Sequence, residues 1–261
     1  MSAVFETEEL RISYNGDAAL RGVSVSLERG SVIGIAGASG SGKTTLLHAA
    51  FGSLGQGCTV DGGSVRLAGC DIFAMNAKER RAYIGKTAGL VPQNPQHSFS
   101  PVRTIGKQLE EVACLKGSPS REEAHALAAE LLGRLGFLDP EEVLARYPFE
   151  LSGGMAQRAS VGMALIGSPE VVFADEPTSA LDTISQAQVV EELLKVNKDM
   201  GVSLVVVSHN IAVLAYISDY LYVMKEGVVV EEGPARQIVE SPVHSYTQKL
   251  VAAVPRFGGK R

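Results

Sequence analysis

Eight residues ending in Lys43 and Thr44 have a composition suited to binding phosphate: Gly37-Ala38-Ser39-Gly40-Ser41-Gly42-Lys43-Thr44. Glycines let the backbone wrap closely, so that successive amide N–H groups can point at phosphate oxygens. Lys43 would reach the terminal phosphates, and the Thr44 hydroxyl would ligate Mg²⁺. An apolar run at residues 31–36 leads into the loop, and residues 43–52 have helical composition. A strand, a glycine loop and a helix in succession predict a phosphate-binding loop.

Two adjacent carboxylates, Asp175 and Glu176, directly follow the apolar run at residues 171–174. A carboxylate at the end of a buried strand beside the phosphate loop suits indirect coordination of Mg²⁺, which we assign to Asp175. Glu176 lies one residue further along, where a base could orient and polarise an attacking water. The alternative interpretation is an acidic turn that caps the strand before Pro177.

A second loop of similar chemistry, Leu151-Ser152-Gly153-Gly154-Met155, precedes a segment of helical composition. A serine and two glycines at a helix start can bind an anion. One nucleotide does not need two phosphate-binding loops from one chain. We therefore expect a dimer in which Ser152, Gly153 and Gly154 cover the ATP held by the other chain. The alternative is an ordinary capped helix start.

These stretches resemble the Walker A, signature and Walker B sequences of ATP-binding cassette (ABC) ATPases, and the resemblance covers nearly the whole chain. It implies that Gln93 contacts Mg²⁺ and the attacking water and links to a membrane partner. It implies that the loop Ser179-Ala180-Leu181-Asp182 crosses the dimer interface, and that His209 hydrogen-bonds the terminal phosphate. Catalysis would then depend on Glu176, His209 and Gln93.

The resemblance also supplies a nucleotide-binding set. Tyr14 lies 29 residues before Lys43, where the family places an aromatic ring that stacks on adenine. The implied cofactors are ATP and Mg²⁺, with the metal held by Thr44, Gln93 and Asp175. The implied nucleotide contacts are Tyr14, Gly37, Ser39, Gly40, Ser41, Gly42, Lys43, Thr44 and Thr45.

One residue and two stretches resemble one branch of the family, the importers of peptides, nickel and related small solutes. They are Met155, residues 94–101 and residues 241–247. The cysteine-bearing C-terminal extension of many peptide members is absent from the sequence. The branch implies a peripheral ATPase on the cytoplasmic face of the inner membrane. Its partners would be a second ATPase subunit, identical or different, two integral membrane permeases and an extracytoplasmic solute-binding protein.

Other functions compete with import. An accessory ATPase of a soluble complex, such as one in phosphonate breakdown, fits the same motifs. Cassettes of DNA repair and translation carry a long coiled coil or a second cassette, neither of which is present in the sequence. The net charge of −5 argues against a nucleic-acid surface, so we expect no nucleic-acid partner.

The remaining composition favours a globular protein without special sites. No apolar stretch approaches the roughly 20 residues that span a bilayer, and the N-terminus has no secretory-signal pattern. Cys58, Cys70 and Cys114 are widely spaced and predict reduced thiols. His97, His125 and His244 lack metal-ligand spacing, so we expect them at the surface or in packing.

The predicted fold is α/β: a P-loop NTPase (RecA-like) core with an antiparallel β subdomain and an inserted helical subdomain. We expect one ABC ATPase domain over 1–261, with the core at about 1–94 and 169–234, the helical subdomain at about 95–168, and a helical tail at about 235–261. Strands are predicted at 4–13, 23–27, 31–36, 65–67, 171–174, 203–208, 221–224 and 228–230. Helices are predicted at 43–52, 104–115, 121–135, 140–146, 154–166 and 184–200, with two more within 236–254.

Overall fold

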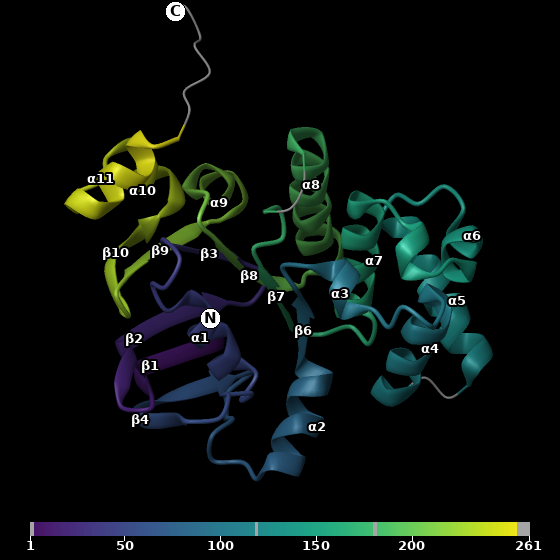
Figure 1. The fold of residues 1–261 in the computed structure, drawn as a ribbon, viewed down its shortest axis with the longest axis horizontal. Coiled ribbons are helices and arrows are strands. Elements are labelled where there is room, and N and C mark those ends of the chain that lie inside the picture. The colour runs from purple at the N-terminus through teal and green to yellow at the C-terminus, as the bar shows by residue number, and fades with distance from the viewer. Residues whose placement is uncertain (1–2, 118–119, 180–181, 255–261) are drawn as a thin grey trace, which may run out of the picture.

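The computed structural model describes residues 3–117, 120–179 and 182–254, which form two sheets and a group of helices (Figure 1). One sheet is antiparallel, with the order β2-β1-β4-β5. Asn15 and Gly16, both with positive φ, turn the chain between its two long strands, as a two-residue hairpin requires. The strands of this sheet are β1 (Ala3–Tyr14), β2 (Asp17–Glu28), β4 (Cys58–Leu67) and β5 (Cys70–Asp71).

The second sheet has six strands in the order β10-β9-β3-β8-β7-β6, and its inner strands run parallel. Every residue of β3 and β8 is buried, which is typical of strands covered on both faces. Parallel strands present their carboxyl ends at one edge, so the loops that follow β3, β7 and β8 meet there. The six strands are β3 (Val32–Ala36), β6 (Ala88–Val91), β7 (Val171–Asp175), β8 (Ser203–Ser208), β9 (Tyr220–Lys225) and β10 (Val228–Pro234).

Helices follow the strands or gather in one group between β6 and β7. Side chains of Thr104, Ser120, Asp139 and Ser152 each cap one of the four longer helices of that group by accepting backbone N–H bonds. The group contains α3 (Pro95–Ser98), α4 (Ile105–Lys116), α5 (Arg121–Arg134), α6 (Pro140–Ala145), the 3-10 turn Pro148–Glu150 and α7 (Gly153–Leu165). The other helices are α1 (Lys43–Ala50), α2 (Ala77–Thr87), α8 (Thr183–Met200), α9 (Ile211–Ile217), α10 (Ala235–Glu240) and α11 (Ser245–Ala252).

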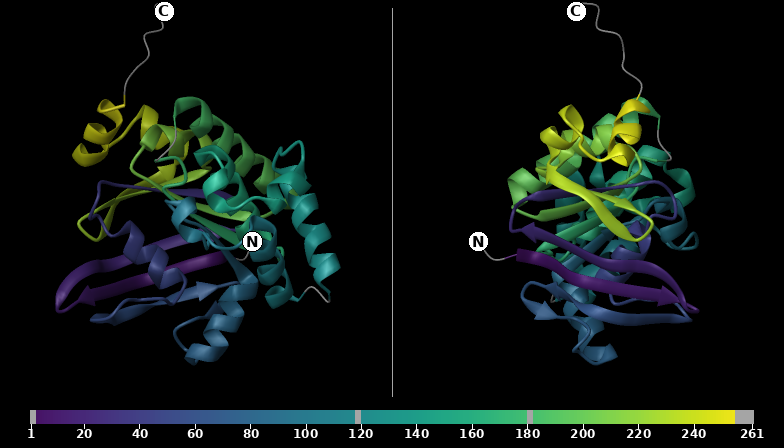
Figure 2. Two further views of the ribbon diagram at one scale, coloured as in Figure 1. Left: turned by 45° about the vertical axis from the view of Figure 1, so that its right-hand side comes forward. Right: turned by 90° about the vertical axis from the view of Figure 1, so that its left-hand side faces the viewer.

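Two apolar cores hold these layers together. One lies between the antiparallel sheet and a face of the main sheet, where the Phe173 ring meets Phe5 and Phe51 edge-on with centroids 5.0 and 5.1 Å apart. The other joins the opposite face to α8, α9 and the helical group. Figure 2 shows the antiparallel sheet, purple and blue, on the other side of the main sheet from α10 and α11, in yellow. Within the described residues, no helix has both the length and the apolar character to cross a bilayer.

The α/β fold class is confirmed, and most predicted elements agree with the structure within two residues. The hairpin of β9 and β10 is confirmed, as is the tail in two helices broken near Ser241. Strands β2, β4 and β10 are longer than predicted, and α2, α3, β5 and β6 were not predicted. Helix α2 buries only Ile84 and Thr87, so its sequence has no apolar stripe to reveal it.

Candidate active site

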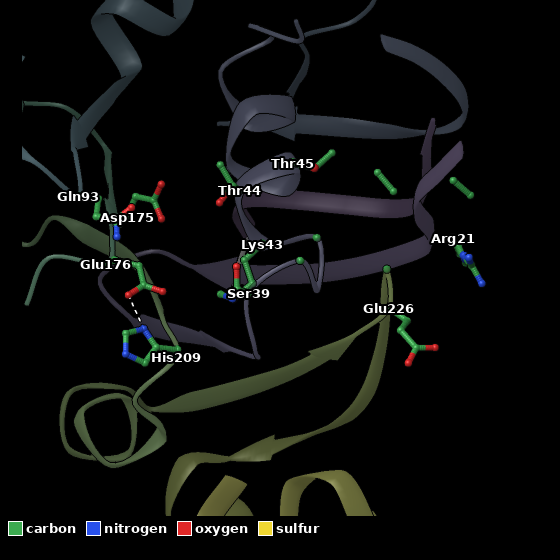
Figure 3. A pocket seen from close by; sticks show the side chains of 15 residues that line it. Arg21, Ser39, Lys43, Thr44, Thr45, Gln93, Asp175, Glu176, His209 and Glu226 are labelled. Atoms are coloured by element: carbon green, nitrogen blue, oxygen red, sulfur yellow. Dashed lines mark hydrogen bonds and ion pairs between the residues drawn. The ribbon is translucent and has the colours of Figure 1, made fainter. Parts of the chain in front are cut away.

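A cavity of about 600 Å³ lies at the carboxyl edge of the main sheet (Figure 3). Its walls come from β2, the loops after β3 and β6, the start of α1, the ends of β7 and β8, and the turn between β9 and β10. The lining residues are Ala18, Ala19, Arg21, Ser39, Gly40, Gly42, Lys43, Thr44, Thr45, Gln93, Asp175, Glu176, His209, Glu226 and Gly227. Sequence segments far apart in the chain therefore meet in one place.

The glycine loop has a backbone that side chains would disturb. Gly40 and Gly42 have φ of +78° and +103°, in the left-handed region that favours glycine. Gly37 approaches strand β9 so closely that a Cβ there would lie 2.4 Å from the carbonyl oxygen of Met224. Helix α1 starts at this loop with no side-chain cap, so its first N–H groups are available to an anion.

The Lys43 side chain is buried at the base of the cavity, with only 6% of the residue exposed. Its Nζ donates to the carbonyl oxygens of Gly37 at 2.7 Å and Ala38 at 2.9 Å. Burial lowers the pKa of Lys43, and the carboxylates of Glu176 and Asp175 act in the opposite direction. The loop therefore holds a buried cation at the wall of the cavity.

Thr44, Gln93 and Asp175 line the same cavity and offer oxygen atoms, the ligands that Mg²⁺ prefers. Burial raises the pKa of Asp175, Glu176 raises it further, and His48 and Lys43 lower it. Among the described residues, no cluster of three or more His, Cys, Asp or Glu side chains could hold a metal alone. The donor set fits Mg²⁺ that is bound by few protein groups and completed by phosphates and water.

Glu176 has a strained backbone and a fixed side chain. Its φ of +47° is unusual for a residue with a Cβ, and its N–H donates to the Val207 carbonyl at 2.9 Å. One carboxylate oxygen lies 2.5 Å from Nδ1 of His209 (Figure 3). Gln93 Nε2 donates to the Ser179 hydroxyl at 3.4 Å, and that hydroxyl donates to the Glu176 carbonyl at 3.1 Å. The predicted catalytic residues therefore form one connected network.

Some predicted site residues lie outside the lining. Tyr14 packs against the core of the antiparallel sheet, where burial and then Cys58 raise its pKa and Thr45 forms a hydrogen bond with it. Ser152 is exposed at the start of α7 and accepts from the N–H of Met155 at 3.3 Å, with Gly153 and Gly154 following it. Asp182 is exposed just before α8; Ala180 and Leu181 lie outside the described residues. Gly37 and Ser41 belong to the glycine loop but do not line the cavity.

Sequence reasoning missed the end of the cavity opposite Glu176 and His209, where Figure 3 places Arg21 and Glu226. The Glu226-Gly227 turn was predicted, but no local signal assigned it to the site. It reaches the cavity because β9 pairs with β3, and the Arg21 N–H donates to the Gly227 carbonyl at 2.8 Å.

Comparisons with known proteins agree with this geometry. The sequence profile described as ABC transporter matches residues 20–179. The chain is 37% identical to a probable D,D-dipeptide transport ATP-binding protein of Escherichia coli K12, over 99% of this chain and 80% of that protein. It is also 37% identical to the glutathione import ATP-binding protein of the same strain, over 99% of this chain. The chain spans only 43% of the length of that second relative.

Solved structures of ATP-binding cassettes also superpose on this chain. A dimeric ATP-binding cassette in a post-hydrolysis state with ADP and Pi superposes with a TM-score of 0.77 at 27% identity, over 89% of this chain and 99% of that one. A Clostridium perfringens protein described as part of an ABC transporter complex superposes with a TM-score of 0.82 at 23% identity, over 98% of this chain and 97% of that one, and supports the fold alone. The chain belongs to the ABC transporter family and is an ATP-binding cassette ATPase.

Proposed function

We propose that the chain is the ATP-binding and hydrolysing subunit of an importer for peptides, nickel or a related small solute. The main observation behind the proposal is that one cavity is lined by Lys43, Asp175, Glu176 and His209. The relatives named above are import or transport ATP-binding proteins for glutathione and a dipeptide, which supports a peptide-like solute.

In the proposed reaction the glycine loop binds the β- and γ-phosphates through its N–H groups and Lys43. Thr44, Gln93 and Asp175 would hold Mg²⁺, which neutralises charge that develops on the phosphate oxygens. Glu176 orients the attacking water and takes up its proton. His209, which now contacts the Glu176 carboxylate, would turn to the γ-phosphate when ATP is bound.

The same proposal assigns Ser152, Gly153 and Gly154 to ATP in a second cassette, and Asp182 to the interface between cassettes. The exposure of Ser152 away from its own cavity supports this assignment. The dimeric state of the related cassette also supports it. The second cassette can be a copy of this chain or a different polypeptide. Tyr14, which lies next to Thr45, would contact the adenine ring.

We propose that two integral membrane subunits dock on the helical group at the cytoplasmic face of the membrane, and that a solute-binding protein delivers cargo to them. Val102 and Phe149 expose 81% and 71% of their surface. Their two segments are joined by a hydrogen bond from Ile105 N–H to the Arg146 carbonyl at 2.8 Å. Exposed apolar side chains at such a junction are typical of a protein-binding surface.

The decisive variant is Glu176→Gln, which keeps the side-chain shape but removes the base. We expect unchanged ATP binding and a loss of turnover of roughly 10²- to 10⁴-fold, measured on the complex purified with its partners. Glu226→Gln is the matched control, because it neutralises an acid at the other end of the same cavity. Normal turnover in Glu176→Gln would refute the base assignment. Membrane permeases among the co-purified chains support import, whereas a soluble enzyme complex would refute it.

A further inference from the structure

A tyrosine from the C-terminal tail contacts the phosphate loop directly. The hydroxyl of Tyr246, on α11, accepts a hydrogen bond from the N–H of Ala38 at 2.9 Å. The two residues are 208 positions apart in the chain, so only the tertiary fold brings them together. Tyr246 belongs to the stretch 241–247, to which the catalytic network described above assigns no role.

The contact fixes one particular peptide group. The carbonyl of Gly37 accepts from Lys43 Nζ at 2.7 Å, and the N–H of the same Gly37–Ala38 peptide donates to Tyr246. Both polar atoms of that peptide are thus engaged, one from inside the loop and one from the tail. The orientation of the peptide determines where Lys43 and the following N–H groups lie.

Other C-terminal elements hold the loop from the same side. The N–H of Gly227 donates to the Ser41 carbonyl at 3.1 Å. The backbone of Met224 lies against Gly37 so closely that no Cβ fits between them. Strand β9, the turn after it and Tyr246 therefore support the loop at three points.

Tyr246 is itself held in position by contacts from two sides. The side chain of Glu231, on β10, accepts the N–H groups of Val243 at 2.7 Å and His244 at 2.9 Å. His244 caps α11 by accepting the N–H of Tyr246 at 3.1 Å. Lys225 Nζ lies 5.8 Å from the centre of the Tyr246 ring, within the range of a cation–π contact.

We propose that Tyr246 is a positioning residue for the phosphate loop, whose hydroxyl preorganises the Gly37–Ala38 peptide for ATP. This inference rests on the proposed function. A loop with three glycines loses much conformational freedom when it becomes ordered, so a contact that orders it before binding increases affinity. Tyr246 is not among the described residues that line the cavity, where the γ-phosphate would bind. Loss of the hydroxyl should therefore weaken ground state and transition state equally, raising KM and leaving kcat unchanged.

The test is Tyr246→Phe, which deletes the hydroxyl and keeps the ring beside Lys225. Loss of one such hydrogen bond should weaken ATP binding by about three- to tenfold. Hydrogen exchange at the Ala38 amide, followed in the nucleotide-free protein, should accelerate by a similar factor. The matched control is Tyr220→Phe, which removes a hydroxyl that lies 3.5 Å from Glu232 on the β9–β10 hairpin. Thermal melting of both variants should match the parent.

The outcomes separate the two proposals. Unchanged ATP affinity and unchanged Ala38 exchange in Tyr246→Phe would overturn the positioning role. A fall in kcat at constant KM would also overturn it. Faster Ala38 exchange in a chain that binds no ATP would support the loop contact while refuting the proposed function.

Discussion

Glu192→Gln should stabilise the protein in a pH-dependent way. Glu192 lies on α8 with 18% of its side chain exposed, 3.6 Å from Nε of Arg158 on α7. Its second carboxylate oxygen is buried without a hydrogen-bond partner. Burial raises the pKa of Glu192 from 4.5 to about 7, although Arg158 and Lys195 act to lower it. Glutamine has nearly the same shape but carries no charge at any pH.

The magnitude follows from the difference between the folded and unfolded pKa. An unfolded chain ionises this carboxyl above pH 4.5, whereas the folded chain keeps it protonated up to about pH 7. Its contribution to stability is therefore complete below pH 4.5 and is lost as pH rises through 7. Between pH 5 and pH 8 the parent should lose about 2.5 kcal/mol that Glu192→Gln keeps.

Chemical denaturation of both proteins at pH 5, 6, 7 and 8 measures this difference. The unfolding free energy of the variant, relative to the parent, should rise from pH 5 to pH 7 and level off by pH 8. Glu191→Gln is the control, because it removes an exposed carboxylate from the same helix and leaves Glu192 in place. A stability difference between Glu192→Gln and the parent that did not change with pH would refute the reasoning. A parent that became more stable relative to the variant as pH rises would also refute it.

Two further predictions concern the phosphate loop. Gly37→Ala should displace the loop and weaken ATP binding about tenfold or more, because its Cβ would lie 2.4 Å from the Met224 carbonyl oxygen. Gly40→Ala is the comparison, because a Cβ at Gly40 would meet open space. It should lower the free energy of unfolding by only about 1–2 kcal/mol, the cost of a left-handed φ for alanine. Equal losses of ATP affinity and of melting temperature in the two variants would contradict this. Lys43→Ala should weaken ATP binding by about 10- to 100-fold and leave adenosine binding unchanged in calorimetric titrations, since Lys43 serves the phosphates. Parallel losses for both ligands would contradict that assignment.

The sequence was most informative where local rules decide the structure. The apolar run at residues 204–207, with a serine at each end, predicted β8 with its observed bounds, 203–208. Asp175 and Glu176 could be assigned to the cavity because they follow a strand whose carboxyl end had to lie beside the glycine loop. Helix α7 was predicted one residue late, at a start where the Ser152 cap is itself a local signal.

The rest depends on contacts between distant segments. Arg21 reaches the cavity through strand pairing, and Tyr246 reaches the phosphate loop through packing of the tail; neither residue carries a local pattern that predicts this. The Arg158–Glu192 pair requires α7 and α8 to pack side by side, although each sequence read alone shows only an ordinary helix. Polar helix α2 was missed because little of it is buried.

The position of β3 in its sheet has a consequence for how the chain matures on the ribosome. The glycine loop is complete at residue 44, but the strands on either side of β3 begin only at residues 203 and 220. Until those strands emerge, the nascent loop has neither neighbour to hold it. Competence to capture a nucleotide is thus acquired only once residues 203–225 have been made, after the helical group.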